Sequence, residues 1–165
     1  MGKHIPPFNN KNEPVIDVND DTTPLCYFNP VSLKQGESYQ YSLDNYESVV
    51  VLAGGTCDIS VNEQSFPSVG KRNSVWEGDP SAVYVPVGST ANITCMSDSA
   101  DVLIAGGYYG DEDRPELEPF AVTPDDVDKV QYGSDDTKTH RKIKHILGQK
   151  NADNRGRLLV SELFT

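Results

Sequence analysis

The chain has 165 residues, 36% of them hydrophobic, with 25 acidic and 14 basic side chains and a formal net charge of −11. This length predicts one domain, and the acidic balance excludes nucleic acid as an expected partner, because phosphate binding depends on clustered Lys and Arg. No apolar run reaches the roughly 18 residues that a membrane-spanning helix needs, so we expect no membrane partner.

Residues 1–23 are polar and rich in Asn, Asp and Pro, which predicts an arm that is mobile or lies along the edge of the domain. The first residues also lack the apolar run of a secretory signal. The chain has three cysteines, Cys26, Cys57 and Cys95, and the last two occupy inward positions of predicted strands. Buried free thiols suit a reducing compartment, so we expect a cytoplasmic protein with structural cysteines.

Short β-rich runs make up residues 24–110. In residues 56–61 (TCDISV) and 91–95 (ANITC), apolar side chains occupy every second position. A period of two predicts strands with one face against a core. Because many such runs are separated by Gly, Pro, Asn and Ser, the region predicts an all-β sandwich, barrel or jelly roll.

Two groups of side chains in this region leave alternatives open. Tyr39 and Tyr41 share one face of a predicted strand, where they either line a pocket or pack a sheet. Lys71, Arg72 and Trp76 lie in a long loop, where they either contact a ligand or a partner subunit or are solvated.

Charge divides the rest of the chain. Residues 111–136 hold ten acids and two bases and predict an acidic connector, whereas residues 137–157 hold seven bases and one acid. The basic segment is either solvated or paired with the connector, or it offers a face to a sugar acid with a carboxylate.

One short helix is predicted over residues 139–150, THRKIKHILGQK, with Asp136 or Thr137 as its cap and Gly148 at its end. His140 and His145 are five residues apart, about 140° around a helix, so they do not share a face as a metal-binding pair would.

Two spacings in the β-rich region resemble the motifs of the cupins, small jelly-roll barrels that often hold a metal. Glu47 and Gly54 are separated by six residues, as in the first cupin motif. Pro86 and Gly88 form a Pro-x-Gly with Gly78 upstream, as in the second. The resemblance implies a cupin-type jelly-roll barrel in which these five residues are structural.

The metal ligands of the cupins have no counterparts at these positions. Gln40, Tyr41, Ser42 and Leu43 occupy the candidate His-x-His positions, and Ala91 stands where the last His belongs. Neutral imidazole and carboxylate bind transition metals, and amide or apolar side chains supply no comparable ligand. The resemblance therefore predicts a barrel without metal-binding, cofactor-binding or catalytic residues.

A longer run sharpens the resemblance. GKRNSVWEGDPSAVYVPVGS, with Glu47 and VVVLAGG upstream, is similar to the amino-terminal half of the 5-deoxyglucuronate isomerases. These are two-barrel (bicupin) enzymes of myo-inositol breakdown, in one family with the 4-deoxy-threo-5-hexosulose-uronate ketol-isomerases. The terminal GRLLVSELFT is similar to the strand that opens the family's second barrel.

The resemblance implies four segments. They are a polar arm at 1–23, a metal-less barrel at 24–110, an acidic connector and basic helix at 111–157, and the first strand of an absent second barrel at 158–165.

The implied activity is an aldose–ketose isomerisation of a deoxy uronic acid. Its divalent metal is expected only in the second barrel, so we expect this chain to be inactive alone and to self-associate or dock to such a barrel. The alternative is a non-catalytic, metal-less cupin that binds a sugar acid or mediates assembly.

Overall fold

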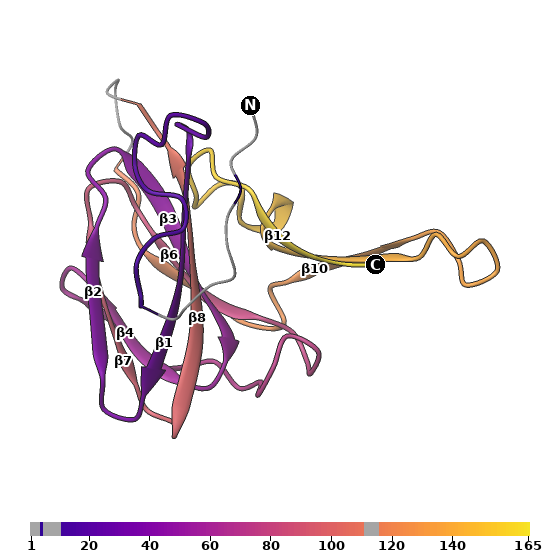
Figure 1. Ribbon diagram of the computed structural model, residues 1–165, viewed down its shortest axis with the longest axis horizontal. Coiled ribbons are helices and arrows are strands. Elements are labelled where there is room, and N and C mark those ends of the chain that lie inside the picture. Colours follow the sequence, from indigo (N-terminus) through magenta and orange to yellow (C-terminus); the bar gives the residue numbers. More distant parts are fainter. Residues whose placement is uncertain (1–3, 5–10, 111–115) are drawn as a thin grey trace.

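The computed structural model describes residue 4 and residues 11–110 and 116–165. Two antiparallel sheets pack face to face as a jelly-roll barrel, and a third, smaller sheet projects from its side (Figure 1). The predicted all-β fold class is therefore confirmed.

The strands fall into three sheets. The first sheet contains, in spatial order, β1 (Cys26–Lys34), β8 (Ser99–Tyr108), β3 (Tyr46–Gly54), β6 (Ser81–Val85) and β9 (Phe120–Val122). The second contains β2 (Ser38–Ser42), β7 (Thr90–Cys95), β4 (Cys57–Val61) and β5 (Gln64–Val69). The third contains β10 (Asp128–Tyr132), β11 (Arg141–Leu147) and β12 (Val160–Phe164).

The first sheet is covered on both faces. On β3, Val50 and Leu52 belong to the core inside the barrel, whereas Val49 and Val51 belong to a second core on the outer face. Such a strand reads as a continuous apolar run, because both of its faces are buried. The outer core is closed by residues from the part of the chain after β8, namely Val122, Val127, Ile146 and Leu147.

Cys57 and Cys95 face the barrel core, as their alternation predicted. They are directly opposite each other on β4 and β7, and both are buried free thiols, whereas Cys26 is exposed. Burial, with a smaller contribution from Cys95, raises the pKa of the Cys57 thiol to about 12. This thiol therefore stays protonated and packs as a small apolar side chain.

The described part of the N-terminal arm lies along β1. The Val15 N–H donates to the Phe28 carbonyl oxygen at 3.0 Å, and Ile16 forms an isolated bridge with Phe28. Asn12, Val15 and Ile16 of the described arm thus contact β1, and the division that makes residues 1–23 an arm stays a prediction. The prediction for residues 1–3 and 5–10 lies outside the described residues, as does that for the connector at 111–115.

The predicted helix at 139–150 is wrong, because residues 141–147 form β11, the central strand of the third sheet. Ile143, Ile146 and Leu147 have the spacing of one face of a helix. In the structure a register shift between His145 and Leu147 instead places both Ile146 and Leu147 in the outer core. Pairing with strands on both sides outweighs the helix propensity of Lys and Arg.

Helical structure in the described residues is confined to one 3-10 turn, Gln149–Asn151. The described chain therefore contains no helix with the length and apolar character needed to cross a membrane.

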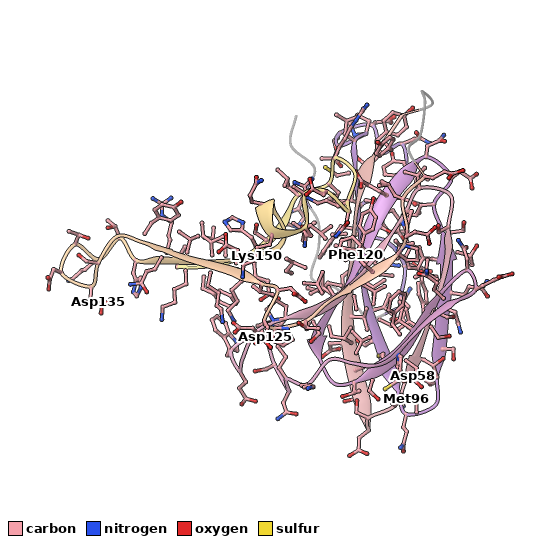
Figure 2. The ribbon with its side chains drawn as sticks, turned by 180° about the vertical axis from the view of Figure 1, so that it is seen from behind. Asp58, Met96, Phe120, Asp125, Asp135 and Lys150 are labelled. Atoms are coloured by element: carbon pink, nitrogen blue, oxygen red, sulfur yellow. The ribbon has the colours of Figure 1, made fainter. Side chains whose placement is uncertain are left out.

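The third sheet extends away from the barrel as a narrow ribbon (Figure 1). Figure 2 shows Asp135 at the far tip, between β10 and β11, and Phe120 of β9, the edge strand of the first sheet, on the barrel. Because β12 pairs with β11 and ends the sheet, one of its backbone edges has no partner strand among the described residues.

Candidate functional site

The structure brings the two motif regions together inside the barrel. Tyr41 of β2 and Ala91 of β7 are cross-strand partners, and both are buried. The Tyr41 hydroxyl lies 2.9 Å from the Ser48 hydroxyl of β3 on the opposite sheet. The positions of expected metal ligands thus hold a phenol and a methyl group, with a serine hydroxyl nearby.

This set of side chains does not fit a transition metal. Burial raises the pKa of Tyr41 well above its ordinary value, so the phenol stays neutral. Neutral hydroxyls and a methyl group are poor ligands compared with imidazole, thiolate or carboxylate. Across the described ranges, no group of three or more His, Cys, Asp and Glu side chains is placed to hold a metal ion.

Glu47 points away from this site. It precedes Ser48 on β3, and neighbouring side chains of a strand point to opposite faces. Ser48 shares the barrel face with Val50, whereas Glu47 shares the outer face with Val49. The one carboxylate at a motif position therefore lies outside the barrel interior.

Glu47 instead anchors the chain that leads into β12. Its carboxylate is 1% exposed and accepts from the Tyr84 hydroxyl at 2.6 Å and from the Arg157 and Leu158 N–H groups, also at 2.6 Å. Burial, and then the hydrogen bond to Glu47, raise the pKa of Tyr84, so this phenol remains a donor. A Cβ at Gly156 would overlap the carboxylate, because the backbone passes so close.

The other motif residues lie in turns and close approaches. A Cβ at Gly54 would lie 2.6 Å from the Asn73 carbonyl oxygen, so glycine lets the long loop pass against β3. Gly78 has a φ of +80° within that loop. Pro86 and Gly88 belong to a β-turn in which the Ser89 N–H donates to the Pro86 carbonyl at 3.2 Å.

Gly88→Val is expected to lower the free energy of unfolding by about 1–3 kcal/mol, because the φ of Gly88 is +73°, where a β-branched residue is strained. Chemical denaturation measures the change. Gly88→Asn is the control and should cost less, since Asn tolerates this conformation. Equal stability of Gly88→Val and the unmodified chain would contradict the turn assignment.

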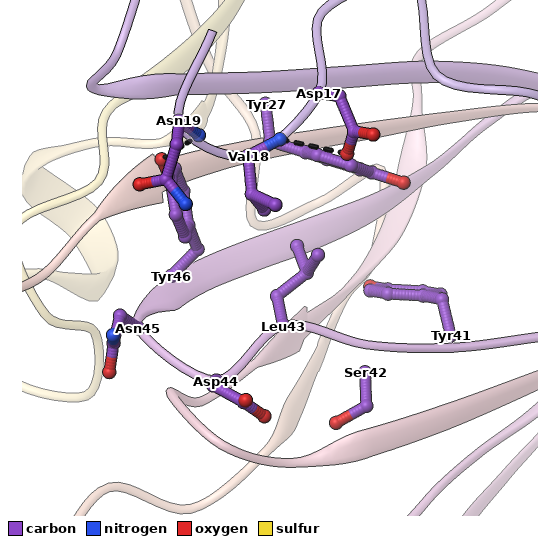
Figure 3. A pocket seen from close by; sticks show the side chains of 10 residues that line it. All are labelled: Asp17, Val18, Asn19, Tyr27, Tyr41, Ser42, Leu43, Asp44, Asn45 and Tyr46. Carbon is purple, nitrogen blue, oxygen red and sulfur yellow. Dashed lines mark hydrogen bonds between the residues drawn. The ribbon is translucent and has the colours of Figure 1, made fainter.

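A cleft of about 390 Å3 opens at the mouth of the barrel (Figure 3). It lies between the arm at 17–19, β1, and the β2–β3 segment at 41–46. Tyr41 borders this cleft, but it belongs to the barrel core and Tyr39 packs against that core, so the packing alternative holds for the tyrosine pair. Tyr39 also donates to the Asn29 side-chain oxygen at 2.8 Å.

The electrostatics of the barrel-mouth cleft favour neutral ligands. Asp17 and Asp44 line it, and no Lys or Arg is among its described lining residues. Burial raises the pKa of Tyr27 to about 12, so its hydroxyl adds no charge. A carboxylate would face two acidic groups here, and the cleft is therefore a poor site for a sugar acid.

A second hollow lies between the loop at 71–80 and the third sheet. Arg72 of the loop is buried and ion-paired with Glu162 of β12, whereas Trp76 is 80% exposed. The sequence pointed to this loop but missed Lys142 and Lys144 as its neighbours. Both lysines lie within the helix predicted at 139–150. Residues 141–145 contain one apolar side chain, Ile143, so no period-two alternation indicated a strand there.

Comparison with known proteins identifies relatives across almost the whole chain. The model of the KduI/IolB family matches residues 3–165. A 5-deoxy-glucuronate isomerase of Halalkalibacterium halodurans is 34% identical over 154 residues, which cover 92% of this chain and 54% of the relative. One from Shouchella clausii is 29% identical over 156 residues, with the same coverage. The chain spans about half the length of these curated relatives.

Solved structures show the same fold. An IolB-like protein from Salmonella typhimurium LT2 superposes with a TM-score of 0.67 at 24% identity, over 74% of this chain and 44% of that one. A putative glyoxylate-induced protein from Pseudomonas aeruginosa superposes with a TM-score of 0.54 at 12% identity, over 75% and 44%. Because the family model covers nearly every residue and the strand arrangement agrees, the chain belongs to the KduI/IolB family.

Proposed function

We propose that this chain is the scaffold half of an aldose–ketose isomerase for a deoxy uronic acid such as 5-deoxyglucuronate. Its membership of the family and its isomerase relatives support the reaction class. The observation that carries the scaffold role is that Tyr41 and Ala91, both buried, occupy cupin ligand positions, with the Ser48 hydroxyl beside Tyr41.

The reaction defines what this barrel does not supply. Isomerisation moves a proton between neighbouring carbons, so it needs an electrophile at the carbonyl oxygen and a base within about 3 Å of the proton. The buried phenol of Tyr41 stays neutral and is no base at pH 7, and Glu47 faces away from the interior. Both missing functions are therefore assigned to a second barrel.

The third sheet offers a place for that second barrel. Among the described strands β12 lies at an edge of its sheet, and an unpaired edge presents a row of backbone N–H and C=O groups to another chain. Leu163 of β12 and Leu159 just before it are exposed and add apolar area. We expect a metal-bearing barrel, or a second copy of this chain, to dock along β12.

The test measures turnover of 5-deoxyglucuronate to its ketose product. The lone chain, with or without added Mn2+ or Zn2+, is expected to show no turnover. Mixed with the carboxyl-terminal half of the Halalkalibacterium halodurans relative, it should raise turnover at least tenfold above that half alone. Turnover by the lone chain that a chelator abolishes would contradict the proposal.

The second candidate function is a non-catalytic barrel that binds a small sugar acid. The hollow beside the third sheet favours it, because lysine and aromatic side chains meet there. A mixture no more active than the carboxyl-terminal half alone, together with direct binding of a sugar acid by this chain, would favour this candidate over the scaffold role.

A further inference from the structure

A groove of about 440 Å3 lies between the loop at 71–80 and the third sheet, and we name it the loop–sheet groove. Its volume is in the range of small-molecule sites. Side chains from the loop and from two strands of the third sheet line it, chiefly Val75, Trp76, Asp79, Lys142, Lys144 and Phe164.

Two aromatic rings form its apolar wall. Trp76 of the loop and Phe164 of β12 meet edge to face, with ring centroids 5.5 Å apart. The Trp76 side chain is nevertheless 80% exposed, so most of the indole remains in contact with water. An exposed aromatic face is a surface on which the apolar C–H face of a sugar ring packs favourably.

The charged side chains of the groove differ in whether they have a partner of opposite charge. Asp79 pairs with Lys129 at 2.7 Å and with Lys144 at 3.3 Å, and the hydrogen bond from Lys129 is the main cause that lowers the pKa of Asp79. Lys144 also donates to the Gly78 carbonyl and lies 5.1 Å from the centre of the Phe164 ring. One carboxylate is therefore shared by two ammonium groups.

Lys142 carries the positive charge that Asp79 does not neutralise. It lines the same groove, and within the described ranges its ammonium group has no carboxylate or hydrogen-bond partner. Among the lining residues Lys142 and Lys144 stand against Asp79 alone, so the groove is locally positive on a chain whose net charge is −11. A carboxylate is the group that complements this local charge.

A buried ion pair holds the two walls in place. Arg72, at the start of the loop, donates through Nε to the Leu52 carbonyl of β3 at 3.0 Å and through Nη1 to Glu162 of β12 at 2.9 Å. The loop and the third sheet are thereby fixed to the barrel before any ligand arrives. A preformed site loses less conformational freedom on binding.

We propose that the loop–sheet groove binds a sugar acid. The sugar ring packs against Trp76 and Phe164, and the carboxylate binds the Lys142 ammonium. The choice of a sugar acid rests on the proposed isomerase function, whereas the preference for a ring with a carboxylate rests on the groove itself. The barrel-mouth cleft, with Asp17 and Asp44, would repel the same ligand.

The single tryptophan of the chain makes the test direct, because its fluorescence reports on the groove alone. The full chain is titrated with D-glucuronate and, separately, with D-glucose at constant ionic strength. Glucuronate should shift the emission to shorter wavelength and saturate with a dissociation constant on the order of 1 mM. Glucose, which lacks the carboxylate, should bind about fivefold more weakly.

Lys142→Ala should weaken glucuronate binding about fivefold and leave glucose unchanged. The matched control is Lys34→Ala, which removes the same charge from an exposed lysine at the end of β1, outside the groove. Thermal melting verifies that both variants fold. Raising the salt concentration should reduce glucuronate binding and spare glucose binding.

Three results would overturn the proposal. They are the absence of a saturable shift, an equal response to glucose and glucuronate, and an emission that shifts with protein concentration in the absence of sugar. The last would show that a second copy of the chain covers the groove. The titration uses neither turnover nor a second barrel, so its failure is distinct from failure of the proposed isomerase function.

Discussion

Replacing Glu47 with Ala is expected to lower the free energy of unfolding by about 3–5 kcal/mol. The substitution removes one buried carboxylate and leaves three donors without an acceptor, the Tyr84 hydroxyl and the Arg157 and Leu158 N–H groups. Each unsatisfied buried donor costs about 1–3 kcal/mol before relaxation. Urea denaturation followed by circular dichroism measures the loss.

Hydrogen exchange separates this anchor from a general effect on packing. The amides of Arg157 and Leu158 should lose their protection in Glu47→Ala before those of the barrel strands do. Glu47→Gln should cost less, because its remaining oxygen still accepts from both amides. Glu63→Ala, at an exposed turn, should change stability by less than about 0.5 kcal/mol. A similarly small effect of Glu47→Ala would refute the anchoring role.

Arg72→Ala is expected to lower the free energy of unfolding by about 3 kcal/mol. The guanidinium group is buried, and its loss leaves Glu162 without its cation and the Leu52 carbonyl without its donor. Glu162 is partly accessible to water, which keeps the expected cost at the lower end for a broken buried pair. Denaturation of the variant measures it.

A double-mutant cycle apportions this loss. Arg72→Ala and Glu162→Gln should be non-additive by more than about 1 kcal/mol, since each removes the same bidentate pair. The neighbouring Lys71→Ala is the matched control, because Lys71 is exposed and should contribute little. Additive effects of the two substitutions would show that the loop and β12 are held together by something other than this pair.

Local patterns were sufficient for the barrel. Residues 56–61 and 91–95 alternate with period two, and they form strands whose apolar side chains enter the barrel core. The Pro86–Gly88 turn was predictable for the same reason, because a turn depends on the conformations of a few adjacent residues.

Part of the candidate site was predictable and part was not. The pairing of Tyr41 with Ala91 agrees with the two motif regions that the sequence singled out. The face of β3 on which the Glu47 side chain lies could not be predicted. Because β3 is apolar on both faces, its sequence does not indicate which face points into the barrel. The contacts that fix it come from Arg157 and Leu158, about 110 residues away.

The sequence by itself determined the all-β class, the inward positions of the barrel strands and the family resemblance, because each depends on neighbouring residues or on a contiguous motif. Only the tertiary structure decided that residues 141–147 form a strand and that Lys142 and Lys144 meet Trp76 across a groove. Strand pairing on both sides of β11 and the Arg72–Glu162 ion pair act between segments far apart in the chain. The intrinsic secondary-structure propensity of a short segment does not depend on such contacts. It therefore favoured a helix at the residues that form a strand of the third sheet.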